Sequence, residues 1–193
     1  MLLNLENYDI ILGSQSPRRQ ELMQGLNLKF RVFTIDVDEN YPPNLQREEI
    51  PVFIARKKAD AYKDILKDNS LLITADTIVW QDGNVFGKPK DEEDAIRVLK
   101  QLSGKIHQVI TGVCITTIKK STVFDVVTNV KFASFSDEEI KYYVENYKPF
   151  DKAGAYGIQE WIGFAGIERV NGSYYNVMGL PIHRLYCELK NWN

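Results

Sequence analysis

Apolar residues recur along the chain in patterns that predict alternating strands and helices. The predicted strands are apolar or alternating runs at 8–12, 29–35, 71–80, 85–86, 107–118, 121–135, 163–170 and 173–177. Turn residues at Lys119-Lys120 and Asn171-Gly172 predict that the last four form two hairpins. Residues 151–159 are too rich in glycine for a regular element.

Apolar residues spaced three and four apart predict the helices. Two are expected at about 17–25 and 51–66, and three more begin near Asp91, Ser136 and Pro181. This mixture predicts one domain over residues 1–193, α/β or α+β in class. Its core would be an extended central mixed sheet flanked by helices.

The start of the first predicted helix breaks a common charge rule. Ser16 suits the N-cap and Pro17 the first helical position, but Arg18 and Arg19 place two cations at the positive end of the helix dipole. With the Ser14 hydroxyl and free backbone N–H groups nearby, a phosphate would fit there. An ordinary solvated basic helix start explains the pattern equally well.

Composition narrows the possible functions. The 193 residues include 24 basic and 26 acidic side chains, for a net charge of −2, which argues against coating a nucleic-acid polymer. No apolar run approaches the length of a membrane span. The two cysteines predict a reducing cytoplasm rather than a disulfide framework, and two histidines leave little for a zinc site or a histidine triad.

One carboxylate interrupts the most apolar predicted strand. Asp76 lies inside 71–80, where an unpaired buried charge would be too costly. It should therefore face a cation, a metal or a cleft, as a general base or metal ligand. The competing interpretation is an edge-strand Asp that caps a neighbouring turn.

Three further residues are candidates for binding. Glu39 follows the strand at 29–35, Lys88 lies on an extended connector before Pro89, and Gln159 ends the glycine-rich loop. A glutamine offers a donor and an acceptor together, which suits the amide edge of a pyrimidine base. Each could equally be an ordinary solvated loop residue. Together with Arg18, Arg19, Lys58 and Asp76 they favour metal-assisted attack of water on a phosphoryl group.

Five motifs, in this order along the chain, resemble those of the Maf nucleotide pyrophosphatases, within the inosine-triphosphate-pyrophosphatase-like superfamily. They are Ser14-Gln15-Ser16-Pro17-Arg18-Arg19, Ala75-Asp76-Thr77, Gly87-Lys88-Pro89, the loop 151–159 and Gly179-Leu180-Pro181. The resemblance covers nearly the whole chain. It implies two lobes around a nucleotide cleft and hydrolysis of a nucleoside triphosphate to the monophosphate and pyrophosphate.

The resemblance also implies roles for single residues. Asp76 would accept the proton of the attacking water, and Glu39 would assist and, with Asp76, bind a divalent metal such as Mg²⁺ or Mn²⁺. The residues expected to hold the phosphates are Ser14, Arg19, Lys58 and Lys88. A homodimer would be in keeping with the family.

Base choice is expected from a second group of residues. The paired arginines and the sequence Ala-Tyr-Gly-Ile-Gln resemble the branch that acts on dTTP and UTP, so Arg18, Thr77 and Gln159 would set the base preference. Gly13 and Glu160 depart from the family, which more often has Ala and Gly there. The alternatives are the same chemistry on another modified or non-canonical nucleotide, and a non-catalytic regulator of cell division.

Overall fold

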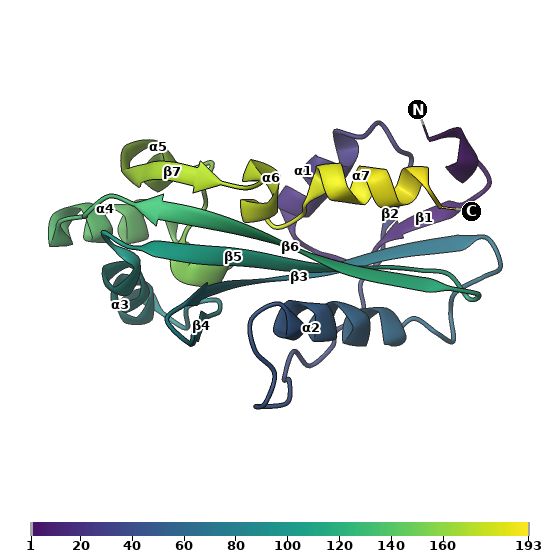
Figure 1. The fold of residues 1–193 in the computed structure, drawn as a ribbon, viewed down its shortest axis with the longest axis horizontal. Helices are drawn as coiled ribbons and strands as arrows, with labels where there is room; N and C mark the ends of the chain where they lie inside the picture. Colours follow the sequence, from purple (N-terminus) through teal and green to yellow (C-terminus); the bar gives the residue numbers. More distant parts are fainter. Residues whose placement is uncertain (1, 193) are drawn as a thin grey trace. The chain divides into compact units, whose positions relative to one another are not determined.

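A seven-stranded mixed sheet runs through the protein (Figure 1). The computed structural model describes residues 2–192, and its sheet has the order β2-β1-β3-β5-β6-β7, with β4 paired to β3. The strands are β1 (Asp9–Leu12), β2 (Arg31–Val32), β3 (Ser70–Gln81), β4 (Asn84–Phe86), β5 (Ile106–Thr116), β6 (Ser121–Phe132) and β7 (Ile167–Asn171). β1 is parallel to β2 and β3, whereas β3–β4 and β6–β7 are antiparallel. The predicted mixed sheet flanked by helices is confirmed.

Helices precede, separate and follow the strands. They are α1 (Pro17–Gln24), α2 (Glu49–Asp60), α3 (Glu92–Leu102), α4 (Asp137–Tyr147), α5 (Trp161–Gly166), α6 (Tyr174–Val177) and α7 (Ile182–Lys190), with 3-10 turns η1 (Leu3–Leu5) and η2 (Ala153–Ala155). Ser16, Asp91 and Ser136 cap α1, α3 and α4 through their side-chain oxygens. Within residues 2–192, none of the helices combines the length and the apolar character that a membrane span needs.

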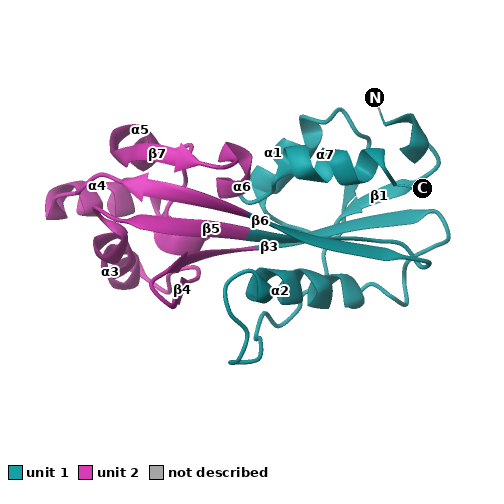
Figure 2. Ribbon diagram, viewed as in Figure 1, with its two compact units in different colours: residues 1–76, 111–126, 179–193 teal, residues 77–110, 127–178 magenta. Residues whose placement is uncertain are grey.

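The chain divides into two compact units (Figure 2). Unit 1 comprises residues 1–76, 111–126 and 179–193, and unit 2 comprises residues 77–110 and 127–178. Strands β3, β5 and β6 each contribute residues to both. In unit 1, α2 lies on one side of the strands and α1 and α7 on the other (Figure 1).

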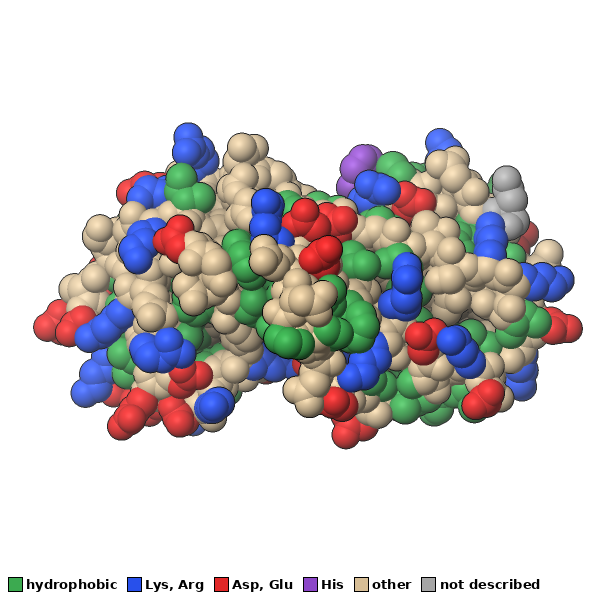
Figure 3. Space-filling view, turned by 60° about the horizontal axis from the view of Figure 1, so that its bottom comes forward, with side chains coloured by type: hydrophobic (Ala, Val, Ile, Leu, Met, Phe, Trp, Pro, Cys, Tyr) green, Lys and Arg blue, Asp and Glu red, His purple; other side chains and the backbone are tan. Residues whose placement is uncertain are grey.

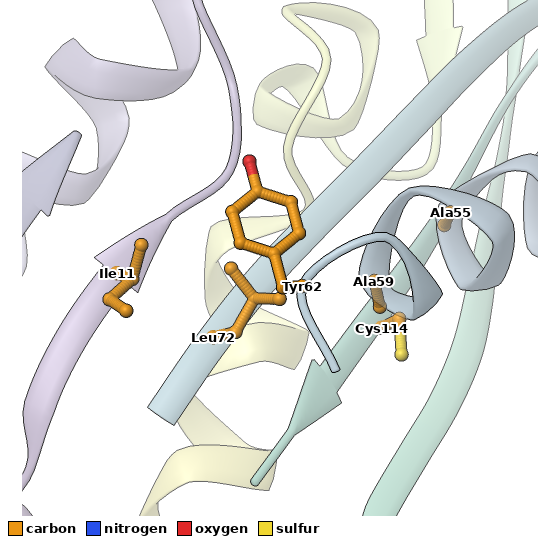
Figure 4. Packing of buried hydrophobic residues seen from close by; sticks show 6 residues of the cluster. All are labelled: Ile11, Ala55, Ala59, Tyr62, Leu72 and Cys114. Atoms are coloured by element: carbon orange, nitrogen blue, oxygen red, sulfur yellow. The ribbon is translucent and has the colours of Figure 1, made fainter. Parts of the chain in front are cut away.

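The core of unit 1 between α2 and the sheet includes Tyr62 (Figure 4). Tyr62 belongs to a buried cluster with Ile11, Leu72 and Cys114, and its hydroxyl donates to Phe33 O at 2.7 Å and accepts from Ile35 N–H at 3.0 Å. Gly13 lies against the same group: a Cβ there would be 2.9 Å from Thr74 Cγ2 and 3.1 Å from the Tyr62 hydroxyl. The glycine that departs from the family therefore allows close packing.

The core of unit 2 contains a cluster of rings from β5, β6 and the loop 151–159. His107, Phe132 and Tyr156 pack edge to face, with centroids 4.8–5.4 Å apart. His107 Nε2 lies 2.8 Å from the Tyr156 hydroxyl. These contacts bring the loop 151–159 against the sheet.

Two predicted elements of unit 1 are shorter than expected. The strand expected at 29–35 has ladder pairs only at Arg31 and Val32. Phe33 N–H still donates to Leu12 O of β1 at 3.3 Å, but Phe33 O and Ile35 N–H bond to the Tyr62 hydroxyl, so the strand does not continue. The helix expected at 51–66 spans Glu49–Asp60. Beyond it the chain continues in tight turns, such as Tyr62 N–H to Ala59 O at 3.0 Å.

The hairpin predicted around Asn171-Gly172 is wrong. Residues 161–166 form α5, β7 pairs with β6, and residues 174–177 form α6. Close packing explains the first change, since a Cβ at Gly163 would lie 1.8 Å from Ile158 O and one at Gly166 1.9 Å from the Phe135 ring. At α6, the Ser173 hydroxyl caps the helix by accepting from Asn176 N–H at 3.2 Å.

Candidate active site

Two carboxylates meet a single ammonium group in unit 1. Lys58 Nζ lies 2.7 Å from Glu39 Oε1 and 2.8 Å from Asp76 Oδ1. Asp76 is 8% exposed, and the Lys58 side chain is 16% exposed. Hydrogen bonds between charged partners are strong at such low exposure. Of the three partners predicted for Asp76, a cation, a metal or a cleft, the structure shows a cation.

The local pattern of β3 and α2 explains this meeting. Alternation along β3 places Thr74 and Asp76 on the same face of the sheet, and Ala55 and Lys58 lie one helical turn apart on α2. Thr74 Oγ1 donates to Ala55 O at 2.7 Å, which fixes the helix over this face. The next side chains along, Asp76 and Lys58, therefore come into contact.

The Lys58 cluster, formed by Lys58, Glu39 and Asp76, could hold a divalent cation. The carboxylates of Glu39 and Asp76 converge on one cationic atom. Carboxylate oxygens are the ligands that Mg²⁺ and Mn²⁺ prefer. Across residues 2–192 no group of three or more His, Cys, Asp or Glu side chains gathers as a metal site. An ion here would need further ligands from a substrate or from water.

The Arg19 guanidinium holds together the segments around this cluster. It donates to Gly179 O at 2.7 Å, to Ala75 O at 2.8 Å and to Ser14 Oγ at 3.3 Å. Burial lowers the pKa of Arg19, and the charge of Asp76 opposes that shift. Arg19 thus joins three segments: the turn after β1 at Ser14, strand β3 at Ala75 and the segment before α7 at Gly179.

The other residues of the first helix turn lie beside these contacts. Ser14 is buried, and its hydroxyl accepts from Ser16 N–H at 3.3 Å. Arg18 is half-buried next to Arg19. Of the residues predicted for a metal-assisted phosphate site, Ser14, Arg18, Arg19, Glu39, Lys58 and Asp76 therefore belong to unit 1, whereas Lys88 belongs to unit 2.

Three predicted site residues belong to unit 2. Thr77 follows Asp76 at the boundary between the units, and Lys88 is exposed on the connector after β4. Gly154 N–H donates to Gly87 O at 3.1 Å, which ties this connector to the loop that ends at Gln159. Gln159 Oε1 is buried and has no hydrogen-bond partner among residues 2–192.

Sequence reasoning missed the residues that hold this loop. Tyr143, Lys152 and Glu160 form a buried network around Gly157, immediately next to Gln159. The sequence does contain one sign that Lys152 has a structural role: it is a lysine beside the small residues Ala153 and Gly154, in a loop that is otherwise mostly apolar. Its pairing with Glu160 depends on the loop path, which no local pattern reveals.

Comparison with known proteins agrees with this site. The family model described as Maf-like protein matches residues 9–192. A protein of Bacteroides fragilis named dTTP/UTP pyrophosphatase is 59% identical over 98% of this chain and 99% of its own. Proteins with the same name from Porphyromonas gingivalis and Flavobacterium johnsoniae are 55% and 52% identical, over 100% and 94% of this chain and 98% and 94% of their own.

Solved structures give a more distant likeness. The Ham1 protein of Staphylococcus aureus aligns with 65% of this chain and 72% of its own at 15% identity, with a TM-score of 0.47. That likeness is too remote to support any statement about activity. The family match spans almost the whole described chain, and the three relatives match over 94–99% of their own length. The chain belongs to the Maf-like protein family.

Proposed function

We propose that this protein hydrolyses dTTP and UTP to the nucleoside monophosphate and pyrophosphate. Full-length relatives that are 52–59% identical carry the name dTTP/UTP pyrophosphatase. The observation that carries the proposal is the Lys58 cluster, where two carboxylates and an ammonium meet beside the Ser14–Arg19 turn. A carboxylate that can activate water next to cations that can neutralise phosphate charge suits attack of water on a phosphoryl group.

The residues of the cluster have distinct roles in the proposed reaction. Asp76 takes a proton from the attacking water, whose oxygen bonds to the α-phosphorus as the bond to the bridging oxygen breaks. The electron pair of that bond leaves with pyrophosphate. Lys58 and Lys88 neutralise phosphate charge, and the Ser14 hydroxyl donates to a phosphate oxygen. Arg19 keeps Ser14 and the Asp76 strand in register through its bonds to Ser14 and Ala75.

A divalent cation is part of the proposal, with Glu39 and Asp76 as its protein ligands. When bound, Mg²⁺ or Mn²⁺ would neutralise the negative charge that develops on the phosphates. The Glu39 side chain is 46% exposed, so it can reorient to bind the cation together with water or a substrate oxygen. The convergence of the two carboxylates on one cation supports this assignment.

Base preference is proposed to rest on Gln159, with Arg18 and Thr77. The Gln159 Oε1 atom is a buried acceptor without a donor in the described chain. Thymine and uracil carry a ring N–H between two carbonyl groups, so one carboxamide can accept from that N–H and donate to a carbonyl. A buried acceptor left unpaired is costly, which would favour a base that supplies the missing donor.

The experiment is a substrate panel that measures pyrophosphate release from dTTP, UTP, dGTP, dATP and modified triphosphates with Mg²⁺ or Mn²⁺. We expect dTTP and UTP to give the highest kcat/KM. Asp76→Asn, which keeps an oxygen for Lys58, should lower kcat about 10²–10⁴-fold with little change in KM. Unchanged activity in Asp76→Asn would contradict the mechanism, and the best rate on a purine or modified nucleotide would contradict the substrate.

Location and assembly follow more general features. Cys114 and Cys187 are both free thiols, which supports the proposal of a reducing, cytoplasmic location. On the face shown in Figure 3, acidic and basic side chains are interspersed, which favours a small nucleotide over a nucleic-acid polymer as the partner. We also propose that residues 1–193 act as one functional domain and that the protein forms a homodimer, which sedimentation analysis would test.

A further inference from the structure

The loop that carries Gln159 has a strained backbone. Gly154 and Ala155 follow one another with φ of 70° and 59°, both in the left-handed region. Ala155 is fully buried, so its unfavourable conformation must be held by its surroundings. Strain of this kind persists where neighbouring contacts fix the backbone, and those contacts can be identified.

Glu160 provides the main fixed point. It directly follows Gln159, and its carboxylate accepts from the Tyr143 hydroxyl through Oε2 and lies 3.1 Å from Lys152 Nζ through Oε1. The Tyr143 hydroxyl also accepts from Gly157 N–H at 3.0 Å, and Glu160 N–H donates to Gly157 O at 3.0 Å. Gln159 is therefore held between two anchored residues, Gly157 and Glu160.

Gly157 itself is needed for this arrangement. A Cβ at that position would lie 2.8 Å from Glu160 Cδ, so only a glycine lets the carboxylate lie across the loop. The Glu160 side chain therefore occupies the space directly over the loop backbone. The position of the Glu160 side chain therefore sets the backbone path of Gln159.

The network is buried, which strengthens its bonds. Tyr143 is fully buried, and the side chains of Lys152 and Glu160 are 9% and 18% exposed. Burial, and after it the hydrogen bond to Glu160, raise the pKa of Tyr143, so the phenol remains a neutral donor. Removing one member would leave a buried partner unsatisfied.

We propose that Tyr143, Lys152 and Glu160 are positioning residues that hold the Gln159 carboxamide for recognition of the pyrimidine base. The inference rests on the proposed function, because it assumes that Gln159 reads the base. Its buried, unpartnered Oε1 can select a base only if the loop keeps it from turning to another donor. We call Tyr143, Lys152 and Glu160 the brace. The brace supplies that constraint without touching the reacting atoms.

The test is the ratio of kcat/KM for dTTP to kcat/KM for dGTP. Tyr143→Phe removes the hydroxyl that serves both Glu160 and Gly157 but leaves the Lys152–Glu160 ion pair. We expect the dTTP KM to rise about fivefold, with kcat and the dGTP KM nearly unchanged. A change of about fivefold is the size expected when one hydrogen bond is poorly placed. Glu160→Gln, which keeps the shape but removes the charge, should change the ratio in the same direction.

Two further variants separate positioning from general structure. Tyr142→Phe changes a tyrosine of the same helix that is 47% exposed, and it should leave the ratio unchanged. Gln159→Leu removes the proposed base contact, and Tyr143→Phe added to it should cause no further loss, because the brace acts only through Gln159. Thermal unfolding of each variant checks that it is folded.

The outcomes distinguish this inference from the proposed function. A normal ratio in both Tyr143→Phe and Glu160→Gln, or fully additive losses in the double variant, would overturn the brace. Equal wild-type activity on dTTP and dGTP would overturn the proposed function, and with it the brace. A lowered ratio with preserved kcat, absent in the Gln159→Leu background, supports the inference.

Discussion

Lys58 lies between Glu39 and Asp76, the two carboxylates proposed as ligands of a divalent metal. Its ammonium lies within 2.8 Å of an oxygen of each carboxylate. Two carboxylates and one ammonium leave a net charge of −1 in the cluster, and a divalent cation would replace the ammonium rather than join it at that point. Binding of metal and release of Lys58 toward the phosphates would then be coupled steps.

Removing this cation should therefore strengthen metal binding while it weakens catalysis. In the protein without nucleotide, Lys58→Met should lower the Kd for Mn²⁺ roughly threefold to tenfold, because the carboxylates no longer have a competing partner. The measurement is an Mn²⁺ titration followed by electron paramagnetic resonance. Pyrophosphate release from dTTP should fall in the same variant, because a phosphate contact is lost.

The neighbouring Lys57 gives a matched control. Its ammonium lies 3.4 Å from Asp38 Oδ2 and 3.0 Å from Asn40 O, outside the Lys58 cluster. Lys57→Met should leave both the Mn²⁺ affinity and the activity close to wild type. Weaker or unaltered Mn²⁺ binding by Lys58→Met would show that the ammonium does not compete with a metal.

At the scale of elements, the site depends on how closely α2 lies on the sheet. A Cβ at Gly112 of β5 would come within 2.4 Å of the Pro51 carbonyl carbon and oxygen, at the start of α2. Because this contact is with backbone, the helix as a whole would have to shift. The same helix carries Lys58, so the contact contributes to the position of the ammonium.

Gly112→Ala should therefore destabilise the protein by about 1–3 kcal/mol or more, the usual cost of overpacking a core. Urea denaturation would measure the change in free energy of unfolding. Gly87→Ala is the control, because a Cβ at Gly87 meets nothing within 4 Å. If both variants were equally stable, α2 could adjust without cost, and the close approach would not fix its position.

Elements with strong local signals were predictable from sequence. The capping box at Ser136 and Glu139 begins α4 where expected, and the apolar runs mark β3, β5 and β6. The errors lie where tertiary contacts override local preference. Gly163 and Gly166 form a helix because they fit against Ile158 and Phe135, information that their own sequence neighbourhood does not contain.

The candidate site shows the same division. A carboxylate inside an apolar strand predicts a cation, a metal or a cleft for Asp76, since burying the charge alone is too costly. That the cation is Lys58 depends on how α2 crosses β3, and that Arg19 bonds to Ala75 and Gly179 depends on segments distant in sequence. The motif resemblance proposed the residues of the candidate site, and the structure shows the contacts within Ser14–Arg19 and within the Lys58 cluster.

At the scale of the whole molecule, stability should depend on pH through His107 in the core of unit 2. The ring is 1% exposed, its Nε2 lies 2.8 Å from the Tyr156 hydroxyl, and its Nδ1 has no hydrogen-bond partner within residues 2–192. Burial lowers the pKa of His107 to about 3, because a charged imidazolium would lose its hydration in this cluster of rings. The folded protein therefore keeps His107 neutral.

The sign of the effect follows from the difference between the two states. In the unfolded chain His107 takes up a proton near its ordinary pKa of 6.5, whereas the folded protein does so only near pH 3. The contribution of neutral His107 to the free energy of unfolding is thus fully present above pH 6.5 and is lost as the pH falls below that value. The slope is about 1.4 kcal/mol per pH unit, or about 2 kcal/mol between pH 7 and pH 5.

Urea denaturation at pH 7, 6 and 5 would measure this loss, and His107→Gln should remove most of it by abolishing the titrating ring. His183→Gln, at the other histidine, is the control, because His183 is exposed and should leave the pH dependence of the wild type intact. The comparison does not go below pH 5, so most carboxylates remain ionised in both states. If His107→Gln loses stability with falling pH as steeply as wild type, another group governs the acid sensitivity, and the buried imidazole is not the pH-sensitive part of the fold.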